Sequence, residues 1–364
     1  MKKLISSSDP IPKPAADMKM AFRAYRVTGM AAAIFLGGLF VAGRAAANPY
    51  LSKPGETPVG IRVATCAVSG GFIHLYTALD NGLFDKYGLK VNHIYIRGSG
   101  ISLAAQAADE IQFLYCAGDG TIPGMAAGID GKLVAAPLVG LPYVLLARKD
   151  IKRPEDLKGK SIGVTRPGDL SFRLSRALLK KFNLSETDVN LRPIGGSQSE
   201  RYNAMAQDII QAIIVTPPLD VRGKRDGFNM IYRLNDLNLP FLYSSLHSNT
   251  KTIQERPQVV QRFVAALAES VQFVEKNPEK AKAAVSKALK LKDQDALQSS
   301  YDAYAKAIIN RRMLVPGDQV ADAVELAKTE TNVRKKASEI FDNRFAEDLE
   351  KSGFMKELWG GKMP

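Results

Sequence analysis

Loops of small and polar residues follow several apolar segments of this chain, and their residue types suit the binding of a small molecule. These loops contain Ser69, Gly70, Phe72, Ser99, Ala117 and Asp119 in the first half, and Thr165, Arg166, Asp169, Ser171, Thr216 and Pro217 in the second. Glycines allow backbone N–H groups to approach a ligand, and a helix that follows such a loop presents free amides and the positive end of its dipole. One loop of this kind is equally well explained as a tight turn. Several of them at matching points of two similar segments predict a ligand-binding cleft.

Arg166 has the most specific chemistry among these residues. Its expected position between a strand and a helix would let the guanidinium hold a carboxylate or sulfonate through two parallel hydrogen bonds. The alternative is a solvated surface arginine. Asp169 is expected to cap the helix that begins at Leu170, and Asp119 places a second negative charge in the other lobe. Because a zwitterion or an amine could use both signs of charge, the charge of the ligand stays open.

The sequence contains no strong signature of catalysis or metal binding. The histidines His74, His93 and His247 form no His-x-x-x-His pair and no cluster with cysteine or aspartate. There is no Gly-x-Ser-x-Gly motif and no Walker loop, and Gly98-Ser99-Gly100 lacks the third glycine of a dinucleotide-binding turn. We therefore expect a binding protein without catalytic residues, metal or cofactor.

Two look-alike segments should position the loops. Residues 60–71 with 81–91, and residues 156–168 with 174–184, each predict a short buried strand, a glycine-rich turn, a helix and a second strand. Strands that alternate with helix-length segments predict parallel sheets, whose ligands bind beyond the carboxyl ends of the strands. The predicted strands are 61–67, 90–96, 110–117 and 133–139 in the first lobe, and 160–165, 189–193, 211–216 and 230–234 in the second. The predicted helices are 72–81, 99–106 (capped by Ser99), 170–182 and 199–207.

Two further segments, residues 142–148 and 241–248, are expected to cross between the lobes. Lobe 1 would then comprise residues 61–147 and 241–290, and lobe 2 residues 148–240. From Thr252 onward the apolar spacing is helical, and residues 291–364 are expected to pack on lobe 1 as a helical segment. The core is expected to include the helical stripe Tyr301, Tyr304, Ile308 and Ile309.

The first 47 residues have the organisation of a secretory signal peptide. Basic residues precede the apolar run 27–43, and Ala45 and Ala47 form a small-x-small cleavage site. We expect cleavage after Ala47, with residues 48–60 as an extended leader. An uncleaved membrane anchor is the alternative, although the run of 17 residues contains four glycines and is short for a span of ~20 residues. The start of translation stays open, because methionines occur within the basic region.

The exported part is basic without resembling a nucleic-acid-binding protein. Beyond residue 47 there are 43 Lys+Arg and 35 Asp+Glu, and no basic run exceeds three residues. Most of the excess lies in residues 148–240, with 17 basic and 11 acidic side chains. This positive charge is explained equally well by attraction of an anionic ligand and by a contribution to solubility.

Cys66 and Cys116 are the only cysteines. Both are expected near the carboxyl ends of strands, where they could face the cleft. An oxidising compartment permits a bridge, but we expect unpaired thiols because neighbouring parallel strands rarely offer disulfide geometry.

The order of five segments along the chain resembles that in the substrate-binding proteins of nitrate/sulfonate/taurine-type ABC transporters. The resemblance rests on residues 61–64, 81–91, 151–164, 255–263 and 277–281, and it covers roughly residues 60–290. The chain is also similar to the hydroxymethylpyrimidine-phosphate synthases that share this fold. It lacks the cysteine-rich iron motif of those enzymes.

The resemblance implies an α/β protein of the type II periplasmic-binding fold, with two lobes, two crossover strands and a helical C-terminal extension. It further implies a periplasmic protein that captures a sulfonate, carboxylate or zwitterion and delivers it to the permease subunits of an ABC importer. We expect a monomer. A synthase-like enzyme and a periplasmic ligand sensor are the alternatives. Gln112 and Gln211 replace acidic residues of the family. Because both precede strands, the expected fold stands, but the identity of the ligand cannot be taken from the family.

Overall fold

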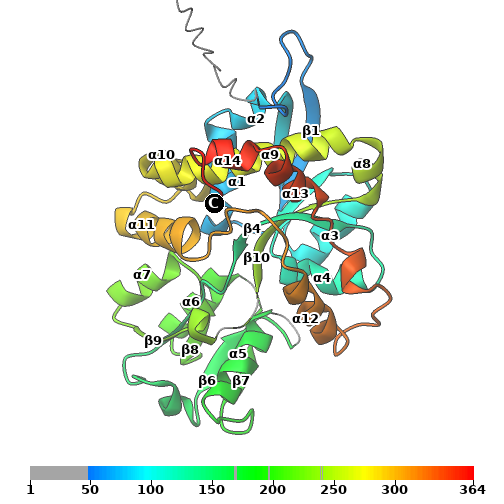
Figure 1. Cartoon of the computed structure of the whole chain (residues 1–364). Coiled ribbons are helices and arrows are strands. Elements are labelled where there is room, and N and C mark those ends of the chain that lie inside the picture. Colours follow the sequence, from blue (N-terminus) through cyan, green and yellow to red (C-terminus); the bar gives the residue numbers. More distant parts are fainter. Residues whose placement is uncertain (1–47, 168–169, 196, 238, 240) are drawn as a thin grey trace, which may run out of the picture. The chain divides into compact units, whose positions relative to one another are not determined.

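The fold is built on two five-stranded sheets (Figure 1). The computed structural model describes residues 48–364 except residues 168–169, 196, 238 and 240. Both sheets belong to one compact unit, Ala45–Pro364. The predicted signal sequence and Asp169 lie outside the described residues.

The sheet of lobe 1 has the strand order β2-β1-β3-β10-β4. Its strands are β1 (Val59–Thr65), β2 (Leu89–Tyr95), β3 (Phe113–Cys116), β4 (Lys132–Val139) and β10 (Leu242–Ser248). β1 pairs in parallel with β2 and β3, whereas β10 runs antiparallel to β3 and β4. A strand that returns late from the other lobe is therefore inserted between β3 and β4.

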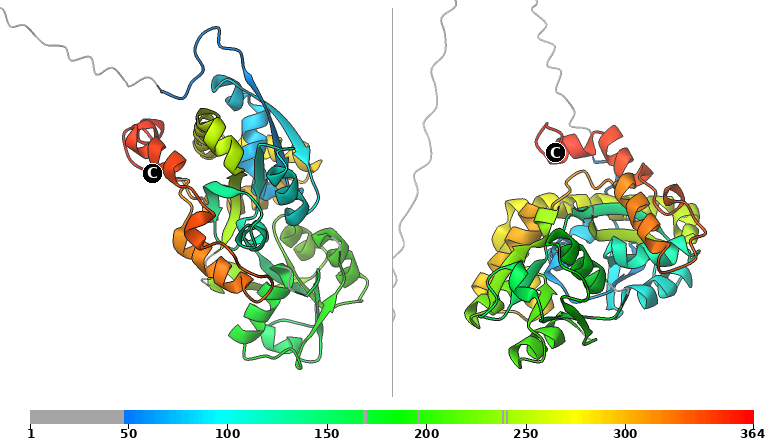
Figure 2. Two further views of the ribbon diagram at one scale, coloured as in Figure 1. Left: turned by 90° about the vertical axis from the view of Figure 1, so that its right-hand side faces the viewer. Right: turned by 90° about the horizontal axis from the view of Figure 1, so that it is seen from below.

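The sheet of lobe 2 repeats this plan in the order β7-β6-β8-β5-β9. Its strands are β5 (Val144–Ala147), β6 (Ser161–Val164), β7 (Asn190–Pro193), β8 (Ala212–Val215) and β9 (Asn229–Arg233). β4 leads to β5 and β9 leads to β10, so the chain crosses between the lobes twice. In Figure 2 (left), the green elements of lobe 2 lie below the blue and cyan elements of lobe 1. This topology confirms the predicted type II periplasmic-binding fold.

The first crossover is shorter than expected. β5 pairs with β8 and β9 of the second sheet, so residues 144–147 belong with lobe 2 rather than with lobe 1. All four residues of β5 are buried. A short apolar strand gives no sign in the sequence of which sheet it will join, which explains the error.

Two glutamines show that the lobes share a local plan. The side-chain oxygen of Gln112 accepts the backbone N–H of Arg62 at 3.0 Å. In lobe 2, the oxygen of Gln211 accepts the backbone N–H of Ser161 at 3.1 Å. Each amide thus satisfies a backbone donor in or beside an adjacent strand. The two residues have a structural function, which a neutral side chain fulfils.

Helices pack around both sheets. In lobe 1 they are η1 (Gly70–Phe72), α1 (Ile73–Asp80), α2 (Leu83–Lys86), α3 (Ser99–Ala107) and α4 (Gly118–Ala126). In and beside lobe 2 they are η2 (Pro154–Leu157), α5 (Leu170–Lys181), α6 (Gln198–Ala206), α7 (Leu219–Arg225) and η3 (Leu234–Leu237). After β10 the chain forms α8 (Thr250–Glu255), α9 (Pro257–Lys276), α10 (Pro278–Leu289), α11 (Gln294–Asp302), η4 (Ala303–Ala307), α12 (Gly317–Ala327), η5 (Ala337–Glu339), α13 (Arg344–Lys351) and α14 (Phe354–Leu358).

Some helix boundaries differ from the prediction. Ser99 is not the cap of α3, because Gly98 occupies that position with a φ of 97° and no side chain caps the helix. Residues 118–120, expected as a loop, form the first turn of α4. α7 was not predicted, because Gly223 is its only buried residue and an apolar stripe is therefore missing.

α9 is a central helix of lobe 1. Pro257 occupies its first turn, where a missing N–H is tolerated, and the helix ends before Pro278. Phe263 lies at the centre of the packing, with its ring centroid 4.4 Å from that of Phe113 and 4.7 Å from that of Phe84. Burial of these rings holds α9 to the sheet.

The C-terminal segment contacts both lobes. α12 packs on α4 of lobe 1. On the other side, Arg225 of α7 forms ion pairs with Asp293 and Asp295, and Ser299 donates to the carboxylate of Asp220 at 2.9 Å. Across the described part of the chain, no helix is both long and apolar enough to span a membrane.

Candidate functional site

Predicted loops of the two lobes are joined by a chain of hydroxyl groups. The Ser69 side chain caps η1 by accepting the N–H of Gly71 at 3.1 Å, and it lies 3.3 Å from the hydroxyl of Tyr243. Tyr243 donates to the hydroxyl of Tyr304 at 3.1 Å, and Tyr304 donates to the carbonyl of Pro217 at 3.0 Å. Both tyrosines are buried. The structure therefore links Ser69 and Pro217 through side chains from β10 and η4.

The glycines at the start of η1 make room for these aromatic rings. A Cβ atom on Gly70 would lie 2.9 Å from Cε2 of Tyr304, and one on Gly71 would overlap the ring of Tyr243. Phe72, also predicted for the site, is buried and contacts the rings of Tyr76 and Tyr115. Close packing thus accounts for residue types that the sequence suggested for contact with a ligand.

In lobe 2, a polar cluster forms around Thr165. Its N–H donates to Ser171 Oγ at 2.8 Å, and the two hydroxyl oxygens are 2.9 Å apart. Arg201 of α6 donates from Nη1 to Thr165 Oγ1 at 3.0 Å and is only 5% exposed. Arg166 is exposed. The buried guanidinium beside the predicted loop is thus that of Arg201.

α6 also holds the next loop. Gln198 accepts both the N–H of Thr216 at 2.8 Å and its hydroxyl at 3.2 Å. Sequence reasoning missed Gln198 and Arg201, although both follow β7 near a helix start. Ser197 caps that start and forms a capping box with Glu200, a pattern visible in the sequence.

Asp119 and Tyr143 bring charge and an aromatic ring to the space between the lobes. Burial raises the pKa of Asp119 to about 7, against the opposing effects of Arg173 and of the Leu242 N–H. The pKa of Tyr143 is raised well above its usual value, first by burial, then by Tyr243 and Asp119, and Arg201 opposes the shift. Tyr143, next to β5, therefore lies close enough to Asp119 of lobe 1 and to Arg201 of lobe 2 for both charges to affect its pKa.

The remaining predicted residues lie beside Asp119. Ala117 is the N-cap of α4 and is half-buried. Ser99 lies close by, because a Cβ atom on Gly120 would come within 2.6 Å of its hydroxyl. The starts of α3 and α4 thus face one another. Among the described residues, no group of three or more His, Cys, Asp or Glu side chains could hold a metal ion.

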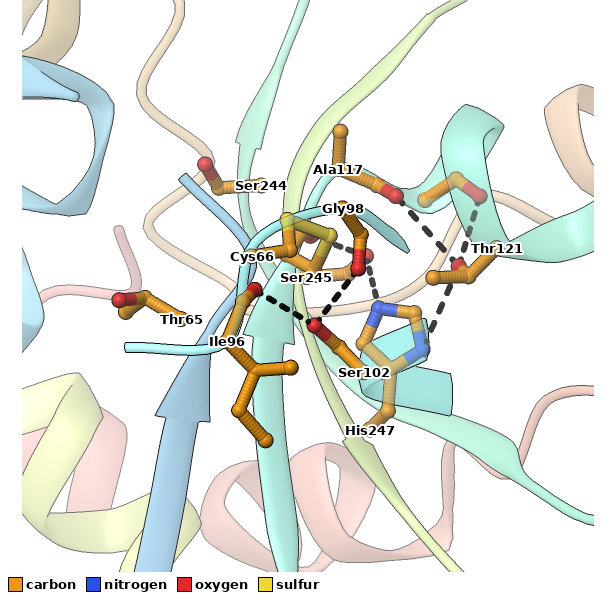
Figure 3. The surroundings of a disulfide bond; sticks show 12 residues. Thr65, Cys66, Ile96, Gly98, Ser102, Ala117, Thr121, Ser244, Ser245 and His247 are labelled. Carbon is orange, nitrogen blue, oxygen red and sulfur yellow. Dashed lines mark hydrogen bonds between the residues drawn. A yellow bond between two sulfur atoms is a disulfide. The ribbon is translucent and has the colours of Figure 1, made fainter. Parts of the chain in front are cut away.

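Cys66 and Cys116 form a disulfide bond, so the prediction of free thiols is wrong (Figure 3). Their Cα atoms are 5.5 Å apart, within the range that a bridge needs. Cys66 follows the last residue of β1, beyond the paired ladder, which lets its side chain turn toward β3. The bridge holds together the exits of two strands that carry site loops.

His247, beside the disulfide, is a structural residue (Figure 3). Its ring nitrogens lie 3.1 Å from Ser245 Oγ and 3.5 Å from Thr121 Oγ1. Burial lowers the pKa of His247 to about 3. It is therefore a neutral, hydrogen-bonded core histidine.

A hollow beside these residues has a volume of about 830 Å³. It lies between α5 and α12 and reaches Asp119 and the crossover residues Leu141 and Phe241. Its volume is in the range of small-molecule sites.

Comparison with known proteins identifies the family. The profile described as NMT1/THI5 like matches residues 70–281, more than half of the chain. The chain belongs to the NMT1/THI5-like family. A relative in Brucella abortus, named only as a binding protein, is 28% identical over 241 residues, which are 64% of this chain and 72% of the relative. Near-equivalent matches occur in Brucella suis and Brucella melitensis.

Solved structures of sulfonate-binding proteins share the fold of this NMT1/THI5-like protein. The periplasmic aliphatic sulphonate-binding protein SsuA of Escherichia coli superposes with a TM-score of 0.63 at 20% identity, over 75% of this chain and 87% of SsuA. The alkanesulfonate-binding protein SsuA of Xanthomonas axonopodis pv. citri, bound to MOPS, gives 0.64 at 16% identity, over 79% and 99%. At these identities the similarity concerns the fold.

Proposed function

We propose that the chain is the exported solute-binding component of an ABC importer and holds a small polar organic solute between its lobes. The observation that carries this proposal is the convergence of polar loops from both sheets next to the crossovers. Asp119 comes from lobe 1, Thr165 and Arg201 from lobe 2, and Tyr143 lies next to both charges. Closure about the two crossovers would bury the solute and change the surface presented to the permease.

The comparisons support a binding role. The relatives are named as binding proteins, and the structural neighbours include periplasmic components that bind sulfonates. In this chain, Thr165, Ser171 and Arg201 offer a cluster of hydroxyl and guanidinium donors that would suit the acid group of a sulfonate, carboxylate or zwitterion.

Recovery of the natural solute tests the proposal most directly. The protein purified from a periplasmic fraction is denatured, and the released small molecules are identified by mass spectrometry. Each candidate is returned to ligand-free protein, for which we expect saturable calorimetric binding, a raised melting temperature and a smaller radius of gyration in solution scattering. Deletion of the gene should abolish uptake of that solute.

Two results would favour a different function. Turnover of the recovered solute by the purified protein alone would favour an enzyme similar to the hydroxymethylpyrimidine-phosphate synthases. Tight binding with unchanged uptake after gene deletion would favour a periplasmic sensor.

A further inference from the structure

The 830 Å³ pocket has one wall outside the residues that match the family profile. Residues of α5 in lobe 2 line one side, and residues of α12 line the other. Both helices are labelled in Figure 1. α12 spans residues 317–327, beyond the residues 70–281 that match the family profile. Asp119, Leu141 and Phe241 lie together at the end next to the crossovers.

The walls of the pocket are largely apolar, and some of their side chains are uncovered. Leu326 of α12 is 59% exposed and Leu239 of the second crossover is 41% exposed. Single exposed leucines are ordinary on a protein surface, but these two line the same hollow as Phe172 and Phe241. A concave apolar surface of this kind is typical of a site for a ligand with an apolar body.

The end next to the crossovers carries an unpaired acid. Among the described residues, no lysine or arginine forms a salt bridge with Asp119, which accepts only the backbone N–H of Leu242. Arg173, the nearby cation, pairs with Glu330 at 3.0 Å. A half-buried carboxylate in apolar surroundings favours an added positive charge.

The basic residues of α5 do not make the pocket an anion site. Arg173 is paired with Glu330, and Arg176 is paired with Glu186 at 2.8 Å. Lys180 lies at the exposed outer end of the helix. An anionic head group at the inner end would instead face Asp119.

We propose that this pocket selects a solute with an apolar body and a protonated amine. The amine binds Asp119, and the body lies against Phe172, Phe241 and Leu326. This inference deepens the proposed function and rests on it for the role of binding in import. It assigns α12 as a determinant of specificity.

Three probes with one skeleton and different head groups test this selection. Calorimetry of the purified full-length protein would compare 4-phenylbutylamine, 4-phenylbutan-1-ol and 4-phenylbutane-1-sulfonate. We expect the amine to bind about tenfold more tightly than the alcohol, because an ammonium group adds an ionic attraction to the carboxylate that a neutral hydroxyl lacks. We expect the sulfonate to bind more weakly than the alcohol.

Two variants assign the contacts. Asp119→Asn should abolish the preference for the amine over the alcohol. Leu326→Ser should weaken both probes by roughly threefold to tenfold, because it removes part of the apolar wall. Leu51→Ser is the matched control, since Leu51 is 41% exposed and does not line this pocket. The melting temperature of each variant confirms folding.

Failure of this inference can be told apart from failure of the proposed function. Equal or tighter binding of the sulfonate, an unchanged amine affinity in Asp119→Asn, or no saturable binding of any probe would overturn the amine selection. If the recovered natural solute binds both variants as tightly as the wild type, the importer role stands and the amine selection does not. If the three probes bind in the expected order but gene deletion causes no uptake defect, the amine selection by the pocket stands and the importer role is overturned.

Discussion

At the scale of single residues, burial separates the two arginines next to the lobe 2 loop. Arg166 is exposed, whereas Arg201 is almost fully buried and donates to Thr165. A guanidinium that is already desolvated interacts more strongly with an anionic ligand than an exposed one. We therefore propose Arg201, rather than Arg166, as the arginine that would bind an acid group of the solute.

Substitution of these arginines should affect binding unequally. If the recovered solute carries an acid group, Arg201→Ala should weaken its binding by about 2–5 kcal/mol, because a buried charge-assisted pair is lost. Arg201→Lys should restore part of this loss, since an ammonium cannot reproduce the planar fork. Arg166→Ala is the matched control and should change the affinity much less. A larger loss in calorimetry for Arg166→Ala than for Arg201→Ala would reverse the assignment.

His74 should make stability depend on pH. Its ring is fully buried, neither nitrogen has a hydrogen-bond partner among the described residues, and burial lowers its pKa from 6.5 to about 3. Between these values the unfolded chain binds a proton that the folded protein excludes. The free energy of unfolding should therefore fall as the pH decreases from about 6.5 toward 3, by up to about 1.4 kcal/mol per pH unit from this residue.

The substitution His74→Leu should remove this contribution. Urea unfolding at several pH values would show a shallower loss of stability in acid than in the wild type. His93→Leu serves for comparison, because His93 is only half-buried and hydrogen-bonded to Thr65 at 3.0 Å. An unchanged slope in His74→Leu would mean that other groups cause the acid sensitivity.

At the scale of elements, a disulfide and a glycine constrain the strand exits and the crossover. The Cys66–Cys116 bridge closes a segment of 50 residues that contains β2 and α3. Gly140, in the first crossover, has a φ of 134°, and its N–H donates to the carbonyl of Phe241 in the second crossover at 2.8 Å. Both features lie near the loops from which the site is built.

Removal of the disulfide should destabilise the protein. For a loop of this length, the entropy of the cross-linked unfolded chain corresponds to about 4 kcal/mol, and measured effects are typically ~2–4 kcal/mol. Unfolding in denaturant should show this loss for a Cys66→Ser, Cys116→Ser double variant. A reducing agent should destabilise the wild type and have no effect on the double variant. Equal stability of the two proteins under oxidising conditions would show that the bridge is not formed.

Gly140→Ala should also be destabilising. The added Cβ would lie 2.7 Å from Cγ2 of Ile308, and the positive φ disfavours any residue with a Cβ. We expect a loss of about 1–3 kcal/mol in thermal or denaturant unfolding. Gly60→Ala is the control, because no atom lies within 4 Å of the added Cβ and the backbone there is not left-handed. Similar losses in both variants would argue against a specific constraint at the crossover.

At the scale of the whole molecule, the two lobes share one strand plan, and the C-terminal helices contact both lobes. Arg173 of lobe 2 pairs with Glu330 after α12, and Arg225 of lobe 2 pairs with Asp293 and Asp295 at the start of α11. These ion pairs join the C-terminal segment to lobe 2.

Export should yield a chain that begins at Asn48. The basic region, the apolar run 27–43 and the alanines at 45 and 47 predict cleavage after Ala47. Intact-mass measurement of the protein from a periplasmic fraction should give the mass of residues 48–364. A full-length chain in the membrane fraction would instead support the uncleaved anchor.

The sequence by itself determined the order of strands and helices, because apolar periodicity and glycine-rich turns are local signals. It also placed Ser69, Thr165 and Thr216 at strand exits, since each follows a recognisable buried strand. The tertiary structure alone decided that β5 joins the second sheet, that Cys66 and Cys116 are bonded, and that Arg201 lies beside Thr165. These outcomes depend on contacts between residues 36 to 71 positions apart, and no local pattern specifies such contacts.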